Sequence, residues 1–262
     1  MYIEKPANEM KSLISVITVC FNSSATIEDT INSVEAQRYS NVEHLVIDGA
    51  STDSTMEIVG QHASIKRVIS EPDGGIYDAM NKGISTAQGE IIGMLNADDL
   101  YADDDVLSRV AELFSDASID ACYADLVYVK QQDTNVIVRY WKSKEFESGL
   151  FKDGWMPAHP TFFVRKSVYE RLGGFDLNYK IAADFELLFR FIEQHKIRTR
   201  YLPKVLVKMR LGGTTNKSLA NIYKQNREIL RVLKCNYSRF SISNFILNKA
   251  ISRFTQFLTK PN

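Results

Sequence analysis

The sequence predicts an α/β fold in which a mostly parallel central sheet is flanked by helices and followed by a helical tail. Three observations predict it. Through residues 13–95, short apolar runs alternate with helical patterns, an order typical of parallel strands joined by right-handed crossovers. Polar clusters follow these runs, as they do where a ligand binds at the carboxyl ends of parallel strands. Residues 216–262 are basic and carry apolar side chains in helical patterns.

Length and composition limit the classes of protein to consider. The chain has 262 residues, enough for one large α/β domain or for one domain with an appendage. Its 32 basic residues balance its 32 acidic residues, so charge gives no case for a nucleic-acid partner. The 3 cysteines are far apart and indicate reduced thiols of a cytoplasmic protein. The charged N-terminal segment is no signal peptide, and no apolar run approaches the roughly 20 residues that span a bilayer.

The first half of the chain contains strands that alternate with helices. The predicted strands are Leu13–Cys20, Leu45–Ile47, Arg67–Ser70 and Gly89–Leu95. After the first strand, a helix carries Ile27, Ile31 and Val34 on one face. Ser54–Glu57 has the pattern of a capping box that opens a second helix, and a third helix ends at Ala87. This alternation predicts a doubly wound sheet.

After Asp99 the order of elements is less regular. The predicted elements are a helix at Asp104–Phe114, strands at Ala121–Val129, Val136–Trp141 and Thr161–Val164, and a helix at Ala183–Gln194. This mixed order predicts a second half that is built onto the same sheet.

The end of the fourth strand is the most informative segment. Asn96, Asp98 and Asp99 follow its apolar run directly. Mg²⁺ and Mn²⁺ prefer such oxygen ligands and often bind through one or two carboxylates together with phosphate oxygens. The segment therefore predicts a divalent-metal site. The alternative is a polar turn that caps the next helix.

Polar clusters also follow the other three strands, and each alone is compatible with turn chemistry. They are Thr18–Asn22, Asp48–Asp53 and Glu71–Tyr77. The first strand is not followed by Gly-x-Gly-x-x-Gly, and a phosphate-binding loop with its Lys is missing, which argues against dinucleotide binding and triphosphate hydrolysis. A sheet that binds a diphosphate without such a loop needs a metal.

The motif order resembles that of the family 2 glycosyltransferases, which have the GT-A (Rossmann-like) fold. The matching segments are Val16–Asn22, Ile47–Asp53, Asn81–Glu90 and Leu95–Asp99, within a resemblance that covers about Ser12–Gly213. Ser70–Asn81 and His159–Phe163 are similar to the branch that makes bacterial cell-surface polysaccharides. The resemblance implies an inverting transferase with Mg²⁺ or Mn²⁺ on the diphosphate of a sugar-nucleotide donor. A UDP-sugar is favoured as donor, and the implied acceptor is a glycan or a lipid-linked saccharide.

The resemblance also implies roles for residues of the donor side. Phe21, Asn22 and Asp48 would hold the nucleoside, although many relatives have two Asp where this chain has Asp48 and glycine. Asp98 matches the direct metal ligand, and Asn96 takes the position nearer the ribose.

Three further donor-side candidates lie around the third helix. Asp73, Tyr77 and Asn81 are four positions apart and would line the donor pocket from one helical face. Tyr77 could instead be an aromatic residue that packs the helix onto the sheet.

On the acceptor side, the resemblance implies that Asp184 is the catalytic base, with Glu186 as the second candidate. The alternative for Asp184 is a helix N-terminal charge that the helix dipole favours. His159 could contact acceptor or donor, or be a structural histidine. Arg210 lies in the basic, glycine-rich segment Lys208–Thr215, which is predicted to close over the diphosphate or to be a linker.

We expect a catalytic domain at residues 1–215, with a nucleotide-sugar half at 1–100 and an acceptor half at 101–215. Residues 216–262 would form a basic amphipathic tail whose only acid is Glu228. Such a tail suits an anionic membrane surface, which predicts a cytoplasmic protein at the inner face of the cell membrane. Alternatively, the tail packs on the catalytic domain or on a second subunit of a homo-oligomer.

Two other functions remain open at this stage. A degenerate sugar-nucleotide-binding module without turnover is suggested only by Asn96, which replaces a carboxylate. A nucleotidyltransferase would usually have a basic, glycine-rich segment near its N-terminus, which Val16–Thr26 lacks.

Overall fold

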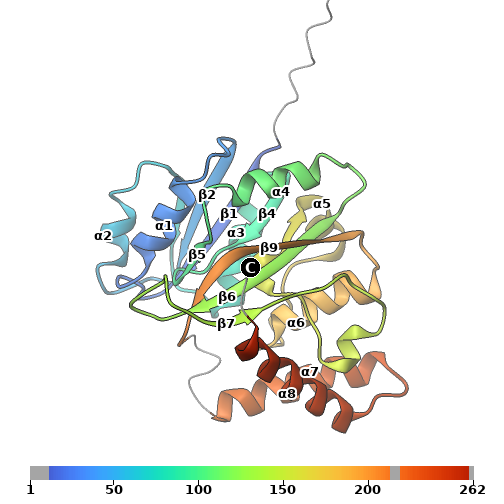
Figure 1. Cartoon of the computed structure of the whole chain (residues 1–262). Coiled ribbons are helices and arrows are strands. Elements are labelled where there is room, and N and C mark those ends of the chain that lie inside the picture. Colours follow the sequence, from blue (N-terminus) through green and yellow to red (C-terminus); the bar gives the residue numbers. More distant parts are fainter. Residues whose placement is uncertain (1–11, 213–218, 260–262) are drawn as a thin grey trace, which may run out of the picture.

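The computed structural model describes residues 12–212 and 219–259. Nine strands form one mixed sheet with the order β3-β2-β1-β4-β8-β6-β9-β5, and β7 pairs with β6 beside β8. Helices cover the sheet, and the two C-terminal helices lie together at one side of it (Figure 1). The predicted α/β class, with a mostly parallel sheet and a helical tail, is confirmed.

The first half of the chain forms the parallel part of the sheet. Its strands are β1 (Ile14–Cys20), β2 (Val42–Asp48), β3 (Ile65–Ser70) and β4 (Ile91–Met94). Its helices are α1 (Ile27–Glu35), α2 (Thr55–Val59) and α3 (Ile76–Thr86). All four strands were predicted. The buried strands β1, β2 and β4 contain nearly continuous apolar runs, whereas β3 is an exposed strand at the edge of the sheet.

The predicted capping box at the start of α2 is wrong. The side chain of Ser54, at the N-cap, makes no capping hydrogen bond. Asp53 takes that place, because its carboxylate accepts a hydrogen bond from the backbone N–H of Thr55 at 3.0 Å. The carboxylate of Asp53 also accepts from the backbone N–H of Ser24 at 3.1 Å, which ties the loop after β1 to the loop after β2.

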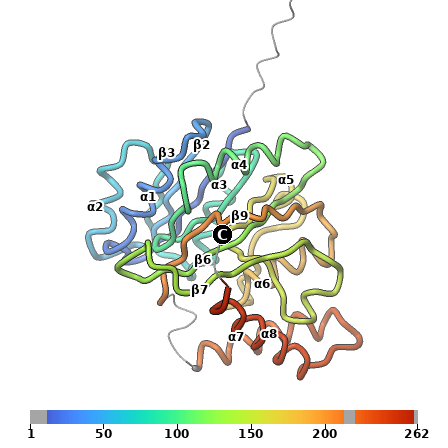
Figure 2. The backbone as a smooth tube through the Cα atoms, viewed as in Figure 1, coloured from blue at the N-terminus to red at the C-terminus, as the bar shows by residue number. Residues whose placement is uncertain are grey.

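The second half adds antiparallel strands and shorter helices. Its elements are β5 (Asp99–Tyr101), α4 (Val106–Phe114), β6 (Ala121–Val129), β7 (Ile137–Trp141), η1 (Leu150–Asp153), η2 (His159–Thr161), β8 (Phe163–Arg165), α5 (Lys166–Leu172), α6 (Ala183–Leu188), η3 (Phe189–Gln194) and β9 (Thr199–Arg210). Strand β8 is antiparallel to β4 and β6, whereas β9 is parallel to β6 and antiparallel to β5. The tube in Figure 2 shows β9 crossing the molecule beside β6.

Strands β5 and β9 were missed from the sequence. Pro203 interrupts β9, and the register against β6 shifts at this point, so that Leu202 pairs with Ala124 and Val205 with Asp125. Proline in a strand is confined to such irregular positions, and it hides the strand from pattern analysis. The predicted helix over Ala183–Gln194 is confirmed in extent, but its second half, η3, is π-helical.

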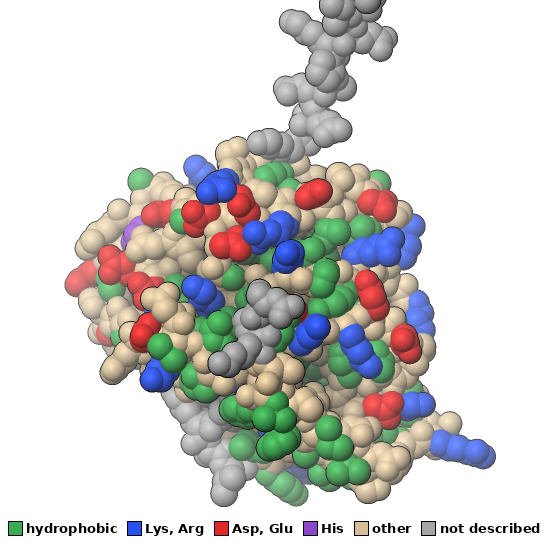
Figure 3. All heavy atoms as spheres, viewed as in Figure 1, with side chains coloured by type: hydrophobic (Ala, Val, Ile, Leu, Met, Phe, Trp, Pro, Cys, Tyr) green, Lys and Arg blue, Asp and Glu red, His purple; other side chains and the backbone are tan. Residues whose placement is uncertain are grey.

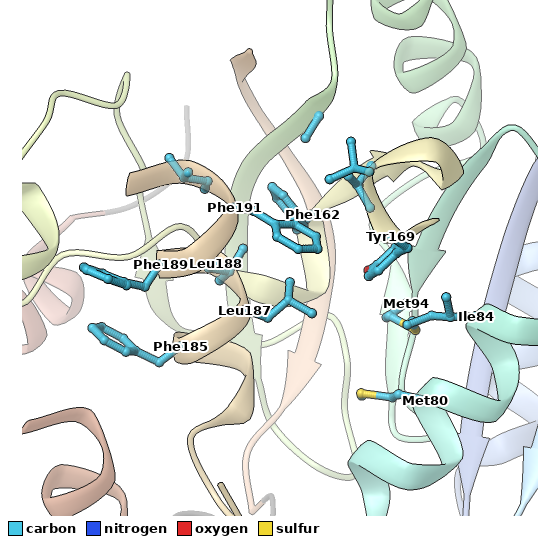
Figure 4. Close-up of a cluster of buried hydrophobic side chains, with 14 of the residues drawn as sticks. Met80, Ile84, Met94, Phe162, Tyr169, Phe185, Leu187, Leu188, Phe189 and Phe191 are labelled. Atoms are coloured by element: carbon cyan, nitrogen blue, oxygen red, sulfur yellow. The ribbon is translucent and has the colours of Figure 1, made fainter. Parts of the chain in front are cut away.

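Alternating residues of the central strands belong to different hydrophobic cores. Ile17 and Val19 of β1 belong to the core that contains α3, α6 and α7, and Ile14 and Val16 belong to the core that contains α4. In Figure 4, side chains from α3, β4 and α6 lie in the first core, with Met80 and Met94 on one side and Phe185 and Leu187 on the other. The sheet is therefore buried between helices, and its strand ends are held rigidly.

The C-terminal helices α7 (Leu219–Asn236) and α8 (Ile242–Leu258) are packed very differently. Ile229, Val232 and Leu233 of α7 are buried in the first core. In α8 the buried residues are Phe245 and Gln256. None of the described helices combines the length and the hydrophobicity that crossing a bilayer requires.

Candidate active site

A cavity of about 750 Å³ opens where β1 and β4 end, between α3 and α6. Eight of the predicted site residues line it: Phe21, Asn22, Asp73, Tyr77, Asn96, Asp98, His159 and Asp184. They come from the loops after β1, β3 and β4, from helix α3, and from the segments η2 and α6 of the second half. The sheet therefore brings both predicted halves of the site to one cavity.

At the end of β4, buried oxygen atoms surround the predicted metal position. The side-chain amide of Asn96 donates to Oδ2 of Asp99 at 3.0 Å. Oδ1 of Asn96 and Oδ1 of Asp99 are both buried, and neither has a hydrogen-bond partner among the described residues. Burial, together with the neighbouring charge of Asp98, raises the pKa of Asp99 well above its usual value. Buried oxygens without a donor beside a carboxylate fit a hard cation.

The charge of the cavity also favours a bound cation. Three carboxylates line it, those of Asp73, Asp98 and Asp184, against the single ammonium group of Lys180 in the described lining. A diphosphate in this cavity would meet net negative charge unless a cation came with it. The described residues contain no group of three or more His, Cys, Asp or Glu side chains arranged to hold a metal. The protein would thus supply few ligands and the diphosphate the others, as is usual for Mg²⁺.

Asp184 lies in the first turn of α6, opposite the metal position. Its Oδ1 accepts a hydrogen bond from the backbone N–H of Phe185 at 2.8 Å and lies 3.3 Å from the hydroxyl of Tyr77. The Tyr77 hydroxyl has a closer acceptor, the carbonyl oxygen of Ile181 at 2.9 Å. Tyr77 therefore lines the cavity and also links α3 to the segment before α6.

The second carboxylate oxygen of Asp184 faces His159. Nδ1 of His159 lies 3.4 Å from Oδ2 of Asp184. Burial lowers the pKa of His159 below its ordinary value of 6.5, against the opposing effect of the Asp184 charge. The imidazole is therefore neutral at pH 7, and a proton on Nδ1 can be donated to Asp184.

The loops after β1, β2 and β3, on the predicted nucleoside side of the site, contact one another. Asn22 has a positive φ of 49°, and its Oδ1 accepts from the backbone N–H of Thr52 at 2.8 Å. Gly49 lies against Asp73, because a Cβ atom at position 49 would be 2.6 Å from Oδ2 of Asp73. A side chain at position 49 would therefore require the carboxylate of Asp73 to move.

Four predicted site residues do not line the cavity. Asp48 is buried, and its Oδ2 accepts from the backbone N–H of Ser51 at 3.0 Å and from the hydroxyl of Ser70 at 2.7 Å. Asn81 exchanges two hydrogen bonds with the backbone of Phe175, at 2.8 and 2.9 Å. Asp73 does line the cavity, but it precedes α3. The prediction that Asp73 and Asn81 share one helical face is therefore wrong.

Glu186 and Arg210, the other two predicted residues outside the cavity lining, contact neighbouring protein groups. Glu186 forms an ion pair with Arg190, in which Nε lies 2.8 Å from Oε1. Arg210 is the last residue of β9, so its predicted place in a loop is wrong. Its guanidinium contacts the carboxylate of Asp29 and donates to the carbonyl oxygen of Asp98 at 3.1 Å. Arg210 thus holds the backbone at the metal position. Residues 213–215 of the predicted loop lie outside the described residues.

Glu228 of α7 was not predicted as part of the site. Its carboxylate accepts hydrogen bonds from the backbone N–H groups of three consecutive residues, Lys180, Ile181 and Ala182, at 3.0, 3.0 and 2.9 Å. These residues lead directly into α6 and Asp184. The only acid of the basic tail therefore positions the candidate base, and its isolation among cations was the signal that could have found it.

The sequence of this chain is similar to the sequences of known glycosyltransferases. Residues 15–173 match the profile of "Glycosyl transferase family 2". An uncharacterized glycosyltransferase of Mycobacterium tuberculosis is 34% identical over 180 residues, which are 68% of this chain and 68% of the relative. A PGL/p-HBAD biosynthesis glycosyltransferase of Mycobacterium bovis is 29% identical over 213 residues, 78% of this chain and 79% of the relative.

Two solved structures share the fold. Residues 1–349 of S. aureus TarS, in complex with UDP-GlcNAc, superpose with a TM-score of 0.67 at 20% identity, over 93% of this chain and 73% of that chain. The mannosyltransferase PcManGT from Pyrobaculum calidifontis, in complex with GDP-Man and Mn²⁺, gives a TM-score of 0.59 at 20% identity, over 97% of this chain and 82% of that chain.

Proposed function

Because the chain belongs to glycosyl transferase family 2 and has the GT-A-like fold of TarS, we propose that it is a metal-dependent inverting glycosyltransferase. It moves a sugar from a nucleoside-diphosphate donor to a hydroxyl group of a glycan or a lipid-linked saccharide, in the biosynthesis of a cell-surface polysaccharide. One observation carries this proposal: Asp98 and Asp184, from opposite halves of the sheet, line the same cavity.

The reaction is a single displacement at the anomeric carbon. The acceptor oxygen forms a bond to this carbon on the face opposite the diphosphate. The bond from the carbon to the diphosphate oxygen breaks, and its electron pair leaves with the nucleotide. The proton of the acceptor hydroxyl passes to Asp184, which acts as general base. Oδ2 is the receiving atom, because Oδ1 already accepts from the backbone N–H of Phe185.

The residues at the end of β4 fit a divalent cation. Asp98 would hold Mg²⁺ or Mn²⁺ together with diphosphate oxygens, and the bound cation neutralises the charge that develops on the leaving diphosphate. Asn96 lies beside this position with a buried oxygen that has no partner among the described residues. Arg210 fixes the Asp98 backbone through its carbonyl oxygen.

The donor occupies the first half of the chain in this proposal. Phe21, Asn22 and Asp73 line the end of the cavity next to the loops after β1 and β3 and hold the nucleoside. Asp48 supports them indirectly. It accepts a hydrogen bond from the backbone N–H of Ser51, and Oγ of Ser51 accepts one from the backbone N–H of Asn22 at 2.8 Å. We favour a UDP-sugar, since TarS binds UDP-GlcNAc in a related fold. A GDP-sugar is the main competitor, because PcManGT binds GDP-Man.

The acceptor occupies the second half, residues 101–215, next to His159 and Asp184. The relative from Mycobacterium bovis takes part in PGL/p-HBAD biosynthesis, which supports a cell-surface glycan as the product class. A lipid-linked acceptor would place the enzyme in the cytoplasm at the inner face of the cell membrane.

Nucleoside-diphosphate release from a panel of UDP-, GDP- and dTDP-sugars tests this function. We expect release with Mn²⁺ for one donor class, and its loss when a chelator removes the metal. Asp98→Asn should lower the metal-dependent rate by more than about tenfold, and Asp116→Asn, a control in the exposed loop after α4, should not. Donor binding without turnover for every donor and acceptor would instead indicate a binding module.

A further inference from the structure

Helix α8 presents an unpacked apolar face. Leu247, Ile251, Phe254 and Leu258 are spaced by four, three and four positions, so they lie on one side of the helix. We call these residues the α8 stripe. Each of them is between 52% and 69% exposed. Ile246 and Phe257, each 58% exposed, flank the stripe. In Figure 3, apolar side chains gather on the lower part of the molecule, where Figure 1 places α7 and α8.

An apolar stripe of this kind is unusual on a folded chain. A surface helix normally turns its apolar side toward the core, as α7 does with Ile229 and Leu233. Contiguous exposed apolar patches mark sites that bind another surface. We infer that the stripe has a partner that residues 12–212 and 219–259 do not supply.

The charge around the stripe identifies the kind of partner. The described part of the tail contains these basic residues: Lys224, Arg227, Arg231, Lys234, Arg239, Lys249 and Arg253. Its only acid, Glu228, is occupied by backbone N–H groups of the loop before α6. The whole chain is electrically balanced, 32 basic against 32 acidic residues, so this excess of positive charge is local.

Two basic residues of α8, Lys249 and Arg253, lie near a third in β7, Arg139. Lys249 and Arg253 are one helical turn apart, and Phe257 is one turn further. The guanidinium of Arg139 in β7 lies 5.8 Å from the Phe257 ring and 3.6 Å from the Tyr128 ring. Burial, followed by the neighbouring charge of Arg253, lowers the pKa of Lys249 to about 8. Nζ of Lys249 donates to Oδ1 of Asn226 at 2.8 Å, so Lys249 lies on the packed side of α8, opposite the stripe. The cations of the tail that are open to a partner include the exposed side chains of Lys224, Arg227, Arg231, Lys234 and Arg239.

We propose that α8 docks the enzyme on an anionic lipid bilayer. The α8 stripe enters the boundary between headgroups and acyl chains, and the basic side chains of the tail contact lipid phosphates, as amphipathic interfacial helices do. None of the four residues of the α8 stripe lines the cavity, so the inference does not depend on the proposed transfer reaction.

A second copy of the chain fits this surface less well than a bilayer does. A twofold interface brings the same patch of both subunits together. Here it would place the basic residues of one tail against those of the other, with no carboxylate from either tail to offset them. An anionic bilayer offers opposite charge over the same area.

Sedimentation of the full chain with vesicles, without any donor, tests the proposal. One set of vesicles contains phosphatidylcholine alone, and the other contains equal parts of phosphatidylcholine and phosphatidylglycerol. We expect binding to the phosphatidylglycerol vesicles that weakens as salt is raised. The double variant Leu247→Ser, Phe254→Ser should lose at least about tenfold in affinity, because two large apolar side chains no longer enter the lipid.

A matched control uses an exposed apolar residue at the other edge of the sheet. Val68 of β3 is 42% exposed, and Val68→Ser should bind vesicles as the unaltered protein does. The double variant and Val68→Ser should both keep the melting temperature of the unaltered protein, since none of the three substituted positions is buried. Equal binding by the double variant, or equal binding to both vesicle types, would overturn the proposal. So would a lipid-free dimer by light scattering that the double variant converts to a monomer.

Discussion

Nδ1 of His159 lies 3.4 Å from Oδ2 of Asp184, which joins a neutral imidazole to the carboxylate proposed as the base. Phe185 supplies the hydrogen bond to the other oxygen of this carboxylate, through its backbone N–H at 2.8 Å. Oδ1 therefore accepts from the protein backbone, whereas Oδ2 faces the imidazole of His159 and keeps lone pairs available to the acceptor hydroxyl. His159 is a positioning residue in this arrangement.

Replacing His159 by Ala should lower kcat by about 10-fold, less than the roughly 10²–10⁴ that a general base contributes. Donor affinity should change little. The rate of the unaltered enzyme should fall as pH drops through the pKa of His159, which lies below 6.5, and His159→Gln should remove this part of the pH profile. Steady-state rates measured across pH check this, with His195→Ala, an exposed position, as control. A pH profile that is unchanged in His159→Gln would contradict the role.

Asp184→Asn should abolish most of the transfer while donor binding persists. The amide has nearly the same shape but cannot accept the proton, so the rate should fall by about 10²–10⁴. Single-turnover transfer and donor affinity by calorimetry separate the two effects. Glu186→Gln serves as comparison, because Glu186 is paired with Arg190 outside the cavity. If Glu186→Gln shows the larger loss of transfer, Glu186 is the base.

Glu228→Gln should reduce both stability and kcat. The carboxylate accepts three backbone N–H groups ahead of α6, and losing its charge should cost about 1–3 kcal/mol of unfolding free energy. The loop that carries Asp184 should loosen, so kcat should fall more than donor affinity. Denaturant unfolding and steady-state kinetics measure these effects. Glu170→Gln, at an exposed residue of α5, should leave both unchanged.

Gly49→Ala should weaken donor binding without unfolding the protein. The new Cβ would lie 2.6 Å from Oδ2 of Asp73, and the Asp73 side chain can turn away. That movement takes the carboxylate out of the position proposed to contact the nucleoside, and we expect about a tenfold loss of donor affinity, which equals roughly 1.4 kcal/mol. Calorimetric titration of the donor measures it. Unchanged affinity would show that Asp73 does not contact the donor.

His44 predicts how stability depends on pH. Burial lowers the pKa of His44 to about 4, whereas the unfolded chain takes up this proton near 6.5. The unfolded state therefore binds more protons below pH 6.5, and stability falls as pH drops from 7 to 4. Between pH 7 and pH 5 this residue should cost about 2 kcal/mol. Denaturant unfolding at both values checks it, and His44→Gln should show a drop that is smaller by that amount.

The parts of this molecule that could be predicted from the sequence are those that local pattern determines. Strands β1, β2 and β4 are buried and are recognisable as apolar runs, whereas β3 is an exposed edge strand of the sheet. The polar residues after them lie at the strand ends by necessity, which is why Asn22, Asp73 and Asp98 all line the cavity.

The errors concern side-chain direction and contacts between distant segments. Whether the last residue of a strand points into the cavity or into the protein depends on a single position of register, and Asp48 points to Ser51 and Ser70. The bond between Arg210 and the Asp98 backbone, and that between Glu228 and the loop before α6, join residues far apart in the chain. Such pairings follow from the tertiary fold and leave no periodic signal.

The hydrogen bonds of Glu228 bear on how this enzyme can be shortened or recombined. Helix α7 also contributes Asn221 to the cavity wall, so a protein that ends after β9 would lose part of its catalytic machinery along with its tail. Chimaeras that exchange tails between relatives should therefore keep α7 with its own loop before α6 and join the foreign segment in the turn between α7 and α8.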